Sequence, residues 1–269
     1  MSVHKKIISD EEVQIIQLLN DLELLGCTLI RQVEKNVVIE KEGEHISRTH
    51  WDIIKMYNEI IAPFHNIKSD RFSPGFYCHL NFTVDVEKND FRIYLLNGLK
   101  EAIGYTIDKQ NSSEVKYEIF RLIDKTIKGL IEDDFEINQF SLLHGDFYNG
   151  NVMFIDGKYS LIDFEYVRFG PSQLEWAFLL FWDLIVENNR DKREKFFYKV
   201  RSDLKILMTN HILSNEDLRL MIELYIPSIV CLSLSSCDKN TFIDKNIVRD
   251  GLMRFWNKEY NIIKGDIYG

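Results

Sequence analysis

The chain has 269 residues, which is enough for one large domain or for two lobes that share a cleft. Hydrophobic residues make up 45% and charged residues 28%, which excludes disorder over most of the length. The 42 acidic residues against 33 basic ones give a formal net charge of -9, which disfavours a nucleic-acid partner and favours a cationic small molecule.

Cysteine spacing and hydropathy indicate the compartment. The four cysteines show no CxxC spacing, so they predict neither a zinc site nor a disulfide framework. The N-terminal segment lacks an apolar run of signal-peptide length, and the most apolar stretch, residues 176–186, is too short to span a bilayer. We therefore expect a cytoplasmic protein without a membrane span.

The first hundred residues predict a small lobe of helices and antiparallel hairpins. Apolar residues at helical spacing predict two helices, over residues 10–25 and 47–61, with Gly26 and Pro63 as their stops. Short β-prone runs predict two hairpins, the first from 28–33 and 36–41 and the second from 76–86 and 91–96.

After Gly98 long helices predominate. They are expected over residues 114–131, 191–213 and 247–263, with a further helix that begins at the capping sequence Ser214 to Asp217. One strand–turn–strand, 152–155 and 159–162, interrupts them and turns at Asp156-Gly157. We therefore expect an α+β fold with a sheet-bearing lobe over residues 1–97 and a large helical lobe over residues 98–269. A hinge is expected near residues 95–98.

The residues most informative about chemistry lie between 142 and 166. A polar loop contains Asp146 and, five residues later, Asn151, and the following hairpin places Asp163 at the end of a buried strand. Phosphoryl transfer needs a carboxylate to accept the proton of the attacking hydroxyl and hard oxygen ligands to hold Mg²⁺. An amide with a carboxylate suits magnesium, whereas histidine or thiolate ligands would indicate zinc.

This segment resembles a known family. His144-Gly-Asp146 with Asn151, followed by Ile162-Asp163-Phe-Glu165-Tyr166, is similar to the aminoglycoside phosphotransferase and choline kinase superfamily, relatives of the protein kinases. The resemblance implies a two-lobed protein-kinase-like fold and a donor that is ATP or GTP. It also implies that Asp146 is the catalytic base, that Asn151 and Asp163 bind Mg²⁺, and that His144 braces the loop.

The predicted N-terminal lobe departs from the family pattern. The hairpin at residues 34–36 contains no glycine, although relatives often cover the phosphates with a glycine-containing loop. Relatives also grip the phosphates with a strand lysine that pairs with a carboxylate. Lys41 is the candidate, with Glu44 or Glu59 as its partner. At the expected hinge, Leu96 and Asn97 are the candidates for contacting the nucleotide base through the backbone.

The acceptor side is predicted from local charge. Between residues 141 and 190 seven acidic residues stand against three basic ones, and aromatic residues are interspersed among them. Carboxylates beside aromatic faces suit an ammonium-bearing alcohol. Glu165, Trp182 and Asp183 are therefore candidate acceptor-binding residues, with Glu175 as a further acidic neighbour. For Trp182, however, burial in the core is the more common role of an aromatic residue at helical spacing.

These observations favour a small-molecule kinase. We expect it to transfer the γ-phosphoryl group of ATP or GTP, with Mg²⁺, to a hydroxyl of a small cationic acceptor such as an aminoglycoside-like or choline-like molecule. Two alternatives stay open: a kinase for a sugar or glycolipid hydroxyl, and a pseudokinase that binds nucleotide or a partner protein without turnover. The reduced N-terminal lobe favours the pseudokinase, whereas the intact set of Asp146, Asn151 and Asp163 disfavours it.

Overall fold

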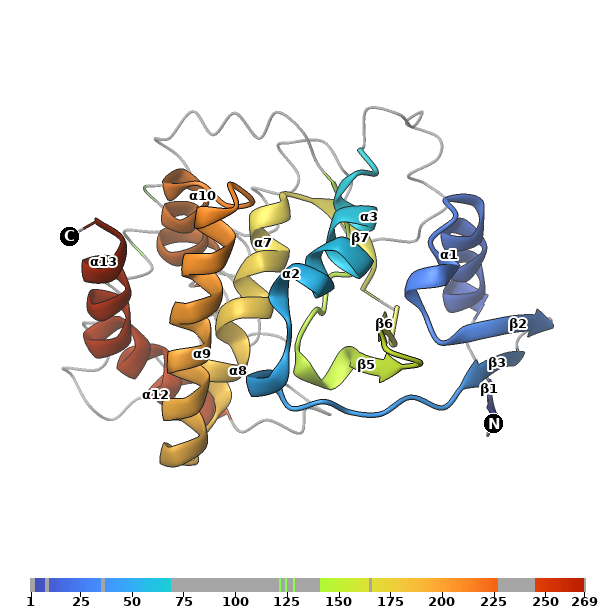
Figure 1. The fold of residues 1–269 in the computed structure, drawn as a ribbon, viewed down its shortest axis with the longest axis horizontal. Helices are drawn as coiled ribbons and strands as arrows, with labels where there is room; N and C mark the ends of the chain where they lie inside the picture. Colours follow the sequence, from blue (N-terminus) through green and yellow to red (C-terminus); the bar gives the residue numbers. More distant parts are fainter. Residues whose placement is uncertain are drawn as a thin grey trace. The chain divides into compact units, whose positions relative to one another are not determined.

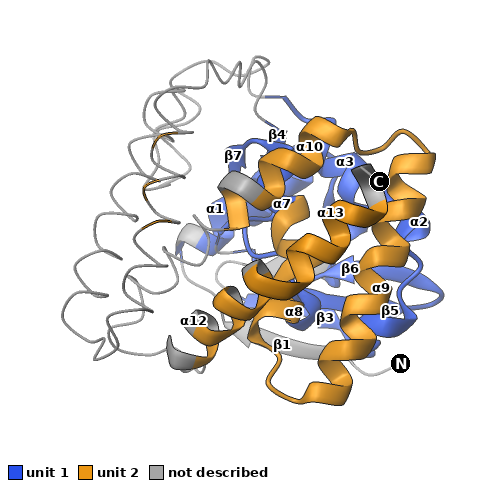
Figure 2. Ribbon diagram, turned by 90° about the vertical axis from the view of Figure 1, so that its left-hand side faces the viewer, with its two compact units in different colours: residues 1–86, 139–175 blue, residues 87–138, 176–269 orange. Residues whose placement is uncertain are grey.

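The computed structural model describes residues 3–7, 10–34, 37–68, 121, 124, 128, 141–164, 166–226 and 245–268. The chain divides into two compact units, residues 1–86 with 139–175 and residues 87–138 with 176–269 (Figure 2). The second predicted hairpin and the expected hinge lie outside the described residues. So does most of the helix predicted over 114–131, of which residues 121, 124 and 128 are helical.

The first unit begins with a three-stranded antiparallel sheet (Figure 1). Strand β3 (Val37–Lys41) lies in the middle, between β1 (Val3–Ile7) and β2 (Ile30–Glu34). The β2–β3 hairpin confirms the sequence-based prediction. Strand β1 was not predicted, because a short run that contains a histidine and two lysines shows no apolar alternation. It forms by pairing along the whole length of β3.

Helix α1 (Asp10–Asp21) follows β1 and ends earlier than predicted. Leu18 and Leu19 on its buried face are 5% and 0% exposed. The backbone then turns at Glu23, whose φ of 60° is left-handed. Gly26 lies beyond this turn in a short 3₁₀ segment, Leu25–Cys27, so the helix stops one turn before the glycine that was expected to end it.

The next helical run extends from Ile53 to His65 through α2 (Ile53–Met56), a π-helical turn (Tyr57–Ile61) and α3 (Ala62–His65). It begins where the Asp52 side chain accepts hydrogen bonds from the first backbone N–H groups, later than predicted. The run also continues past Pro63, the expected stop. Proline lacks an N–H group, so the carbonyl of Glu59 loses its usual helical donor. The thiol of Cys27 donates to that carbonyl instead, at 3.4 Å.

Two further strand pairs complete the first unit. The hairpin of β5 (Val152–Ile155) and β6 (Lys158–Leu161) has the predicted position, and its turn residues Asp156 and Gly157 both have positive φ. Strand β4 (Ser141–Leu143) pairs with β7 (Arg168–Gly170). Together these pairs bracket the polar loop and the end of β6, which the sequence analysis singled out.

The second unit is helical in its described part. Its elements include α8 (Asp183–Val186), α9 (Arg190–Thr209), α10 (Asn215–Leu220), α12 (Lys245–Arg254) and α13 (Tyr260–Tyr268). Helix α7 (Ser172–Ala177) and the π-helical turn Phe178–Trp182 lead into it from the first unit. The predicted capping box at Ser214 and Asp217 is confirmed. No helix in the part of the chain that the structure describes is long and apolar enough to cross a bilayer.

Helix α12 packs closely against α8. A Cβ atom on Gly251 would come 1.8 Å from the carbonyl oxygen of Ile185, so only glycine permits this approach. The guanidinium of Arg254 lies 3.3–3.4 Å from the carbonyl oxygens of Leu184, Ile185 and Glu187 at the end of α8. A cation at this position satisfies carbonyls that have no helical donor and interacts favourably with the helix dipole.

Candidate active site

The polar loop leaves β4 through a left-handed glycine. Gly145 has φ +84°, and a Cβ atom there would come 2.0 Å from the carbonyl oxygen of Tyr166. No other residue fits this position without moving the backbone of one of the two segments. The loop therefore passes directly against the Tyr166 segment and presents Asp146 at the next position.

Asn151 holds Asp146 in place. Its side-chain amide nitrogen donates to the backbone carbonyl of Asp146 at 2.8 Å and to Oδ2 of the Asp146 carboxylate at 3.0 Å. Asn151 is 4% exposed and ends a short 3₁₀ turn, Asn149–Asn151, that runs directly into β5. Because the nitrogen is committed to Asp146, the amide oxygen is the atom of Asn151 that suits a metal ion.

Asp163 lies two residues beyond the end of β6, with a left-handed φ of 65°. Aspartate tolerates this region better than most residues, because its short polar side chain can form hydrogen bonds with the nearby backbone. Burial raises the pKa of the Asp146 carboxyl, and the negative charge of Asp163 raises it further, against the hydrogen bond from Asn151. Asp146 and Asp163 thus lie within electrostatic reach of each other.

The oxygen atoms of this site fit magnesium. Asp163 offers a carboxylate and Asn151 an amide oxygen, and Mg²⁺ normally takes one or two protein ligands together with phosphate oxygens and water. No cluster of three or more His, Cys, Asp or Glu side chains in the described ranges could hold a metal by itself. A metal held by Asp163 and Asn151 would therefore need phosphate oxygens or water to complete its coordination.

His144 is completely buried and contacts the hairpin that carries Asp163. Its Nε2 lies 2.9 Å from the carbonyl oxygen of Ile162, so this nitrogen carries the hydrogen. Among the described residues, Nδ1 has no hydrogen-bond partner. The ring also packs edge-on against Phe164, with centroids 5.2 Å apart. This arrangement fits the expected supporting role, because the ring joins the loop to the β6 end.

Glu175 is a functional candidate whose position the sequence analysis did not foresee. It is 3% exposed, and its Oε1 accepts hydrogen bonds from the backbone N–H groups of His144 at 2.6 Å and Gly145 at 3.1 Å. Its Oε2 lies 3.0 Å from Nε2 of His65. A carboxylate between the apolar residues Leu174 and Trp176 was the only sequence signal, and Glu175 was counted with the acceptor-side charges.

Lys41, the predicted phosphate-binding lysine, ends β3 and is 7% exposed. Its ammonium group pairs with Asp156 in the β5–β6 turn rather than with Glu44 or Glu59. Glu59 instead accepts a hydrogen bond from the backbone N–H of Tyr159 at 2.9 Å. Two further lysines, Lys5 and Lys6, lie on the unforeseen strand β1.

The remaining predicted site residues are not brought together by the described structure. Trp182 and Asp183 belong to the second unit, where Trp182 is 7% exposed and packs against Phe178 with ring centroids 5.6 Å apart. Glu165, Leu96 and Asn97 lie outside the described residues. Their roles stay predictions.

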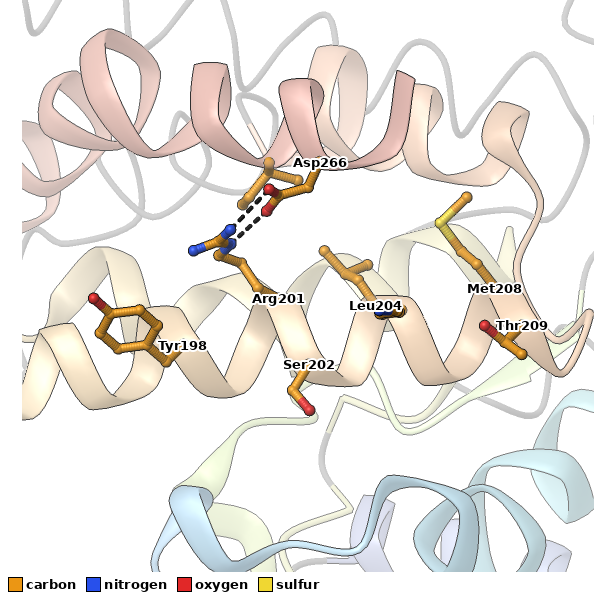
Figure 3. A pocket seen from close by; sticks show the side chains of 9 residues that line it. Tyr198, Arg201, Ser202, Leu204, Met208, Thr209 and Asp266 are labelled. Atoms are coloured by element: carbon orange, nitrogen blue, oxygen red, sulfur yellow. Dashed lines mark hydrogen bonds and ion pairs between the residues drawn. The ribbon is translucent and has the colours of Figure 1, made fainter. Parts of the chain in front are cut away.

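A cavity of about 600 Å³ lies between α9 and α13 of the second unit (Figure 3). The apolar part of its lining comes from Leu204, Met208 and Ile263. The guanidinium of Arg201 forms a bidentate ion pair with Asp266 across the cavity. No predicted site residue lines this cavity. The polar groups of the loop and of the β5–β6 hairpin are therefore the basis for assigning a function.

Comparison with known proteins agrees with the resemblance seen in the sequence. A family model described as the phosphotransferase enzyme family matches residues 89–197, which include the polar loop and Asp163. No curated protein matches the chain. The match confirms the resemblance carried by the His144 to Tyr166 segment, and it agrees with the expected class, a small-molecule phosphotransferase.

Solved structures confirm the protein-kinase-like α+β fold. A choline/ethanolamine kinase family protein from Mesorhizobium loti is 10% identical, with a TM-score of 0.59 over 96% of this chain and 82% of its own. A choline kinase from Cryptosporidium parvum Iowa II is 12% identical, with a TM-score of 0.56 over 98% and 84%. An aminoglycoside phosphotransferase from Alicyclobacillus acidocaldarius is 15% identical, with a TM-score of 0.56 over 98% and 85%.

Proposed function

We propose that the protein is a magnesium-dependent kinase that transfers the γ-phosphoryl group of ATP or GTP to a hydroxyl of a small cationic acceptor. The observation that carries this proposal is the arrangement of Asp146, Asn151 and Asp163. A half-buried carboxylate is held by an amide, and a second carboxylate stands within electrostatic reach. Phosphoryl transfer requires this combination of a positioned base and hard oxygen ligands.

In the reaction, Asp146 accepts the proton of the acceptor hydroxyl while that oxygen attacks the γ-phosphorus. The bond from the γ-phosphorus to the β,γ-bridging oxygen breaks, and the nucleoside diphosphate leaves with that oxygen. The raised pKa of Asp146 makes it a better proton acceptor than an exposed aspartate. Asn151 fixes the carboxylate through its amide nitrogen, and its amide oxygen would hold magnesium together with Asp163. When bound, the metal would neutralise charge on the transferring phosphoryl group.

On the donor side, the structure offers two positions for the phosphate-binding lysine. Lys41 was predicted, but it pairs with Asp156 in a hairpin turn rather than with a glutamate on a helix. In protein kinases the lysine lies on a strand and pairs with a glutamate on a helix. Strand β1 carries Lys5 and Lys6 and precedes α1, which begins Asp10-Glu11-Glu12. We therefore favour a β1 lysine for the phosphates.

On the acceptor side, Tyr166 supports a cationic substrate. Its side chain is 50% exposed, and its backbone packs against Gly145, the residue before Asp146. An exposed aromatic ring can contact an ammonium group through its face. The solved structures of this fold include proteins named for choline, aminoglycosides and glucosamine, all of which carry positive charge. Glu165, Trp182 and Asp183 stay candidates for the same role.

The direct test is a coupled assay of nucleotide consumption with ATP and with GTP, with and without Mg²⁺. The acceptor panel contains choline, ethanolamine, glucosamine, an aminoglycoside and a neutral sugar. We expect magnesium-dependent turnover with at least one cationic acceptor and its loss in Asp146→Asn. Efficient use of the neutral sugar alone would refute the cationic acceptor. Nucleotide binding without turnover for any acceptor would favour a pseudokinase.

A further inference from the structure

Two buried side chains, Glu175 and His65, support the loop that carries Asp146 through hydrogen bonds. Glu175 is 3% exposed and His65 is 8% exposed, and they come from helices 110 residues apart in the sequence. Neither has a place in the chemistry proposed above. Both residues belong to the same compact unit as the loop.

The two oxygen atoms of Glu175 have separate partners. Oε1 accepts from the backbone N–H groups of His144 and Gly145, at 2.6 Å and 3.1 Å, and Oε2 lies 3.0 Å from Nε2 of His65. An ionised carboxylate only accepts hydrogen bonds, so His65 is the donor. On the other side of the loop, the guanidinium of Arg168 donates to the carbonyl oxygen of Gly145 at 3.4 Å.

We propose that His65 is a positioning residue for phosphoryl transfer: its hydrogen bond fixes the Glu175 carboxylate, which in turn fixes the backbone from which Asp146 projects. This inference rests on the proposed function. A buried carboxylate oxygen that loses its donor must rotate toward another partner or admit water. Rotation withdraws Oε1 from the two N–H groups, and a mobile water in place of His65 holds the carboxylate less firmly. Both changes loosen Gly145, the residue next to Asp146.

The docking of α3 does not depend on this hydrogen bond. Beyond the end of α3, the carbonyl of Ile67 accepts from the N–H of Leu142 in β4 at 2.8 Å, and Lys68 donates to the Ser141 hydroxyl at 2.7 Å. Neither of these contacts involves the imidazole of His65. The effect of changing His65 is therefore expected in the loop rather than in the attachment of the helix.

The test uses two variants of His65 and one matched control. His65→Leu removes the donor, whereas His65→Gln keeps an N–H group within reach of Glu175. Lys199→Leu is the control, because it removes the donor to another fully buried carboxylate, Asp203, at 2.6 Å in the second unit. We expect His65→Leu to lower kcat about tenfold or more, with the nucleotide KM within about twofold of wild type. His65→Gln should keep most of the wild-type kcat, and Lys199→Leu all of it.

A second readout does not depend on activity. Amide hydrogen exchange at His144 and Gly145, compared with exchange at Leu142, reports whether Glu175 still holds the loop. Exchange at the first two amides should rise in His65→Leu and stay at the wild-type level in His65→Gln. If His65→Leu does not fold, Glu175→Gln replaces it, because this variant keeps the side-chain shape while weakening the acceptor. It should lower kcat and raise exchange at the same two amides.

Each outcome decides the proposal. Unchanged exchange at His144 and Gly145 in His65→Leu would overturn it, and so would raised exchange with an unchanged kcat. A loss in His65→Gln as large as that in His65→Leu would show that the hydrogen bond is not what matters. If wild-type protein transfers phosphate to no acceptor, the proposed function fails, and the exchange data still decide whether His65 holds the loop.

Discussion

Replacing Asp146 by asparagine should remove activity without destabilising the protein. Asparagine has nearly the same shape, and its side-chain oxygen can still accept the 3.0 Å hydrogen bond from Asn151. The 2.8 Å bond from Asn151 to the backbone carbonyl at this position is unaffected. The variant cannot accept the proton of the attacking hydroxyl, so kcat should fall by a factor on the order of 10² or more.

The effect on stability follows from the direction of the pKa shift. Burial and the charge of Asp163 raise the pKa of Asp146 in the folded protein, so folding disfavours its ionised form. At neutral pH Asp146→Asn should therefore be at least as stable as wild type. Below the unfolded pKa of 3.8 Asp146 is protonated in both states, so the advantage should be lost as the pH falls through the raised folded pKa toward that value.

Thermal unfolding in EDTA from pH 7 to pH 4 measures this difference without metal, and a coupled assay with Mg²⁺ and nucleotide measures kcat. Asn151→Asp is a useful companion variant, because it places a third carboxylate at the site and should destabilise the metal-free protein. A lower melting temperature for Asp146→Asn at pH 7, or a kcat close to that of wild type, would refute the assignment of Asp146 as a buried catalytic base.

Three further predictions concern other parts of the chain. Alanine at one of the two β1 lysines should raise the nucleotide KM about tenfold or more, whereas Lys41→Ala should change it little. The reverse result in a nucleotide titration would show that Lys41 binds the phosphates. Gly145→Ala should lower the free energy of unfolding by about 2–4 kcal/mol, because alanine there has a positive φ and clashes with backbone atoms. Gly157→Ala should lower it by about 1 kcal/mol, because only the positive φ is unfavourable there. Equal losses of stability in urea unfolding would contradict this prediction. Burial raises the pKa of the Cys27 thiol from 9.0 to about 11, so stability should fall between pH 9 and pH 11, and Cys27→Ala should abolish that part of the pH dependence.

The sequence by itself determined the elements whose causes are local. Asp156-Gly157 specifies the turn of the β5–β6 hairpin, because both positions need positive φ. Ser214 with Asp217 specifies a helix start, because the two side chains satisfy each other's backbone groups. The short chain distance from Asp146 to Asn151 likewise brings these two side chains together, so the closeness of the two candidate residues was predictable from spacing.

Tertiary structure decided the features that depend on partners far along the chain. Strand β1 exists because β3 offers it an edge, and Lys41 pairs with Asp156 because the β5–β6 turn lies beside the end of β3. Where the helical run passes Pro63, the distant Cys27 donates to the carbonyl that proline leaves without its usual donor. The sequence placed Glu175 among the acidic residues of the acceptor side, since only the fold shows that two loop amides and His65 surround it. Local pattern fixes which backbone shape a segment prefers, but a buried polar group is placed by the distant group that completes its hydrogen bonds.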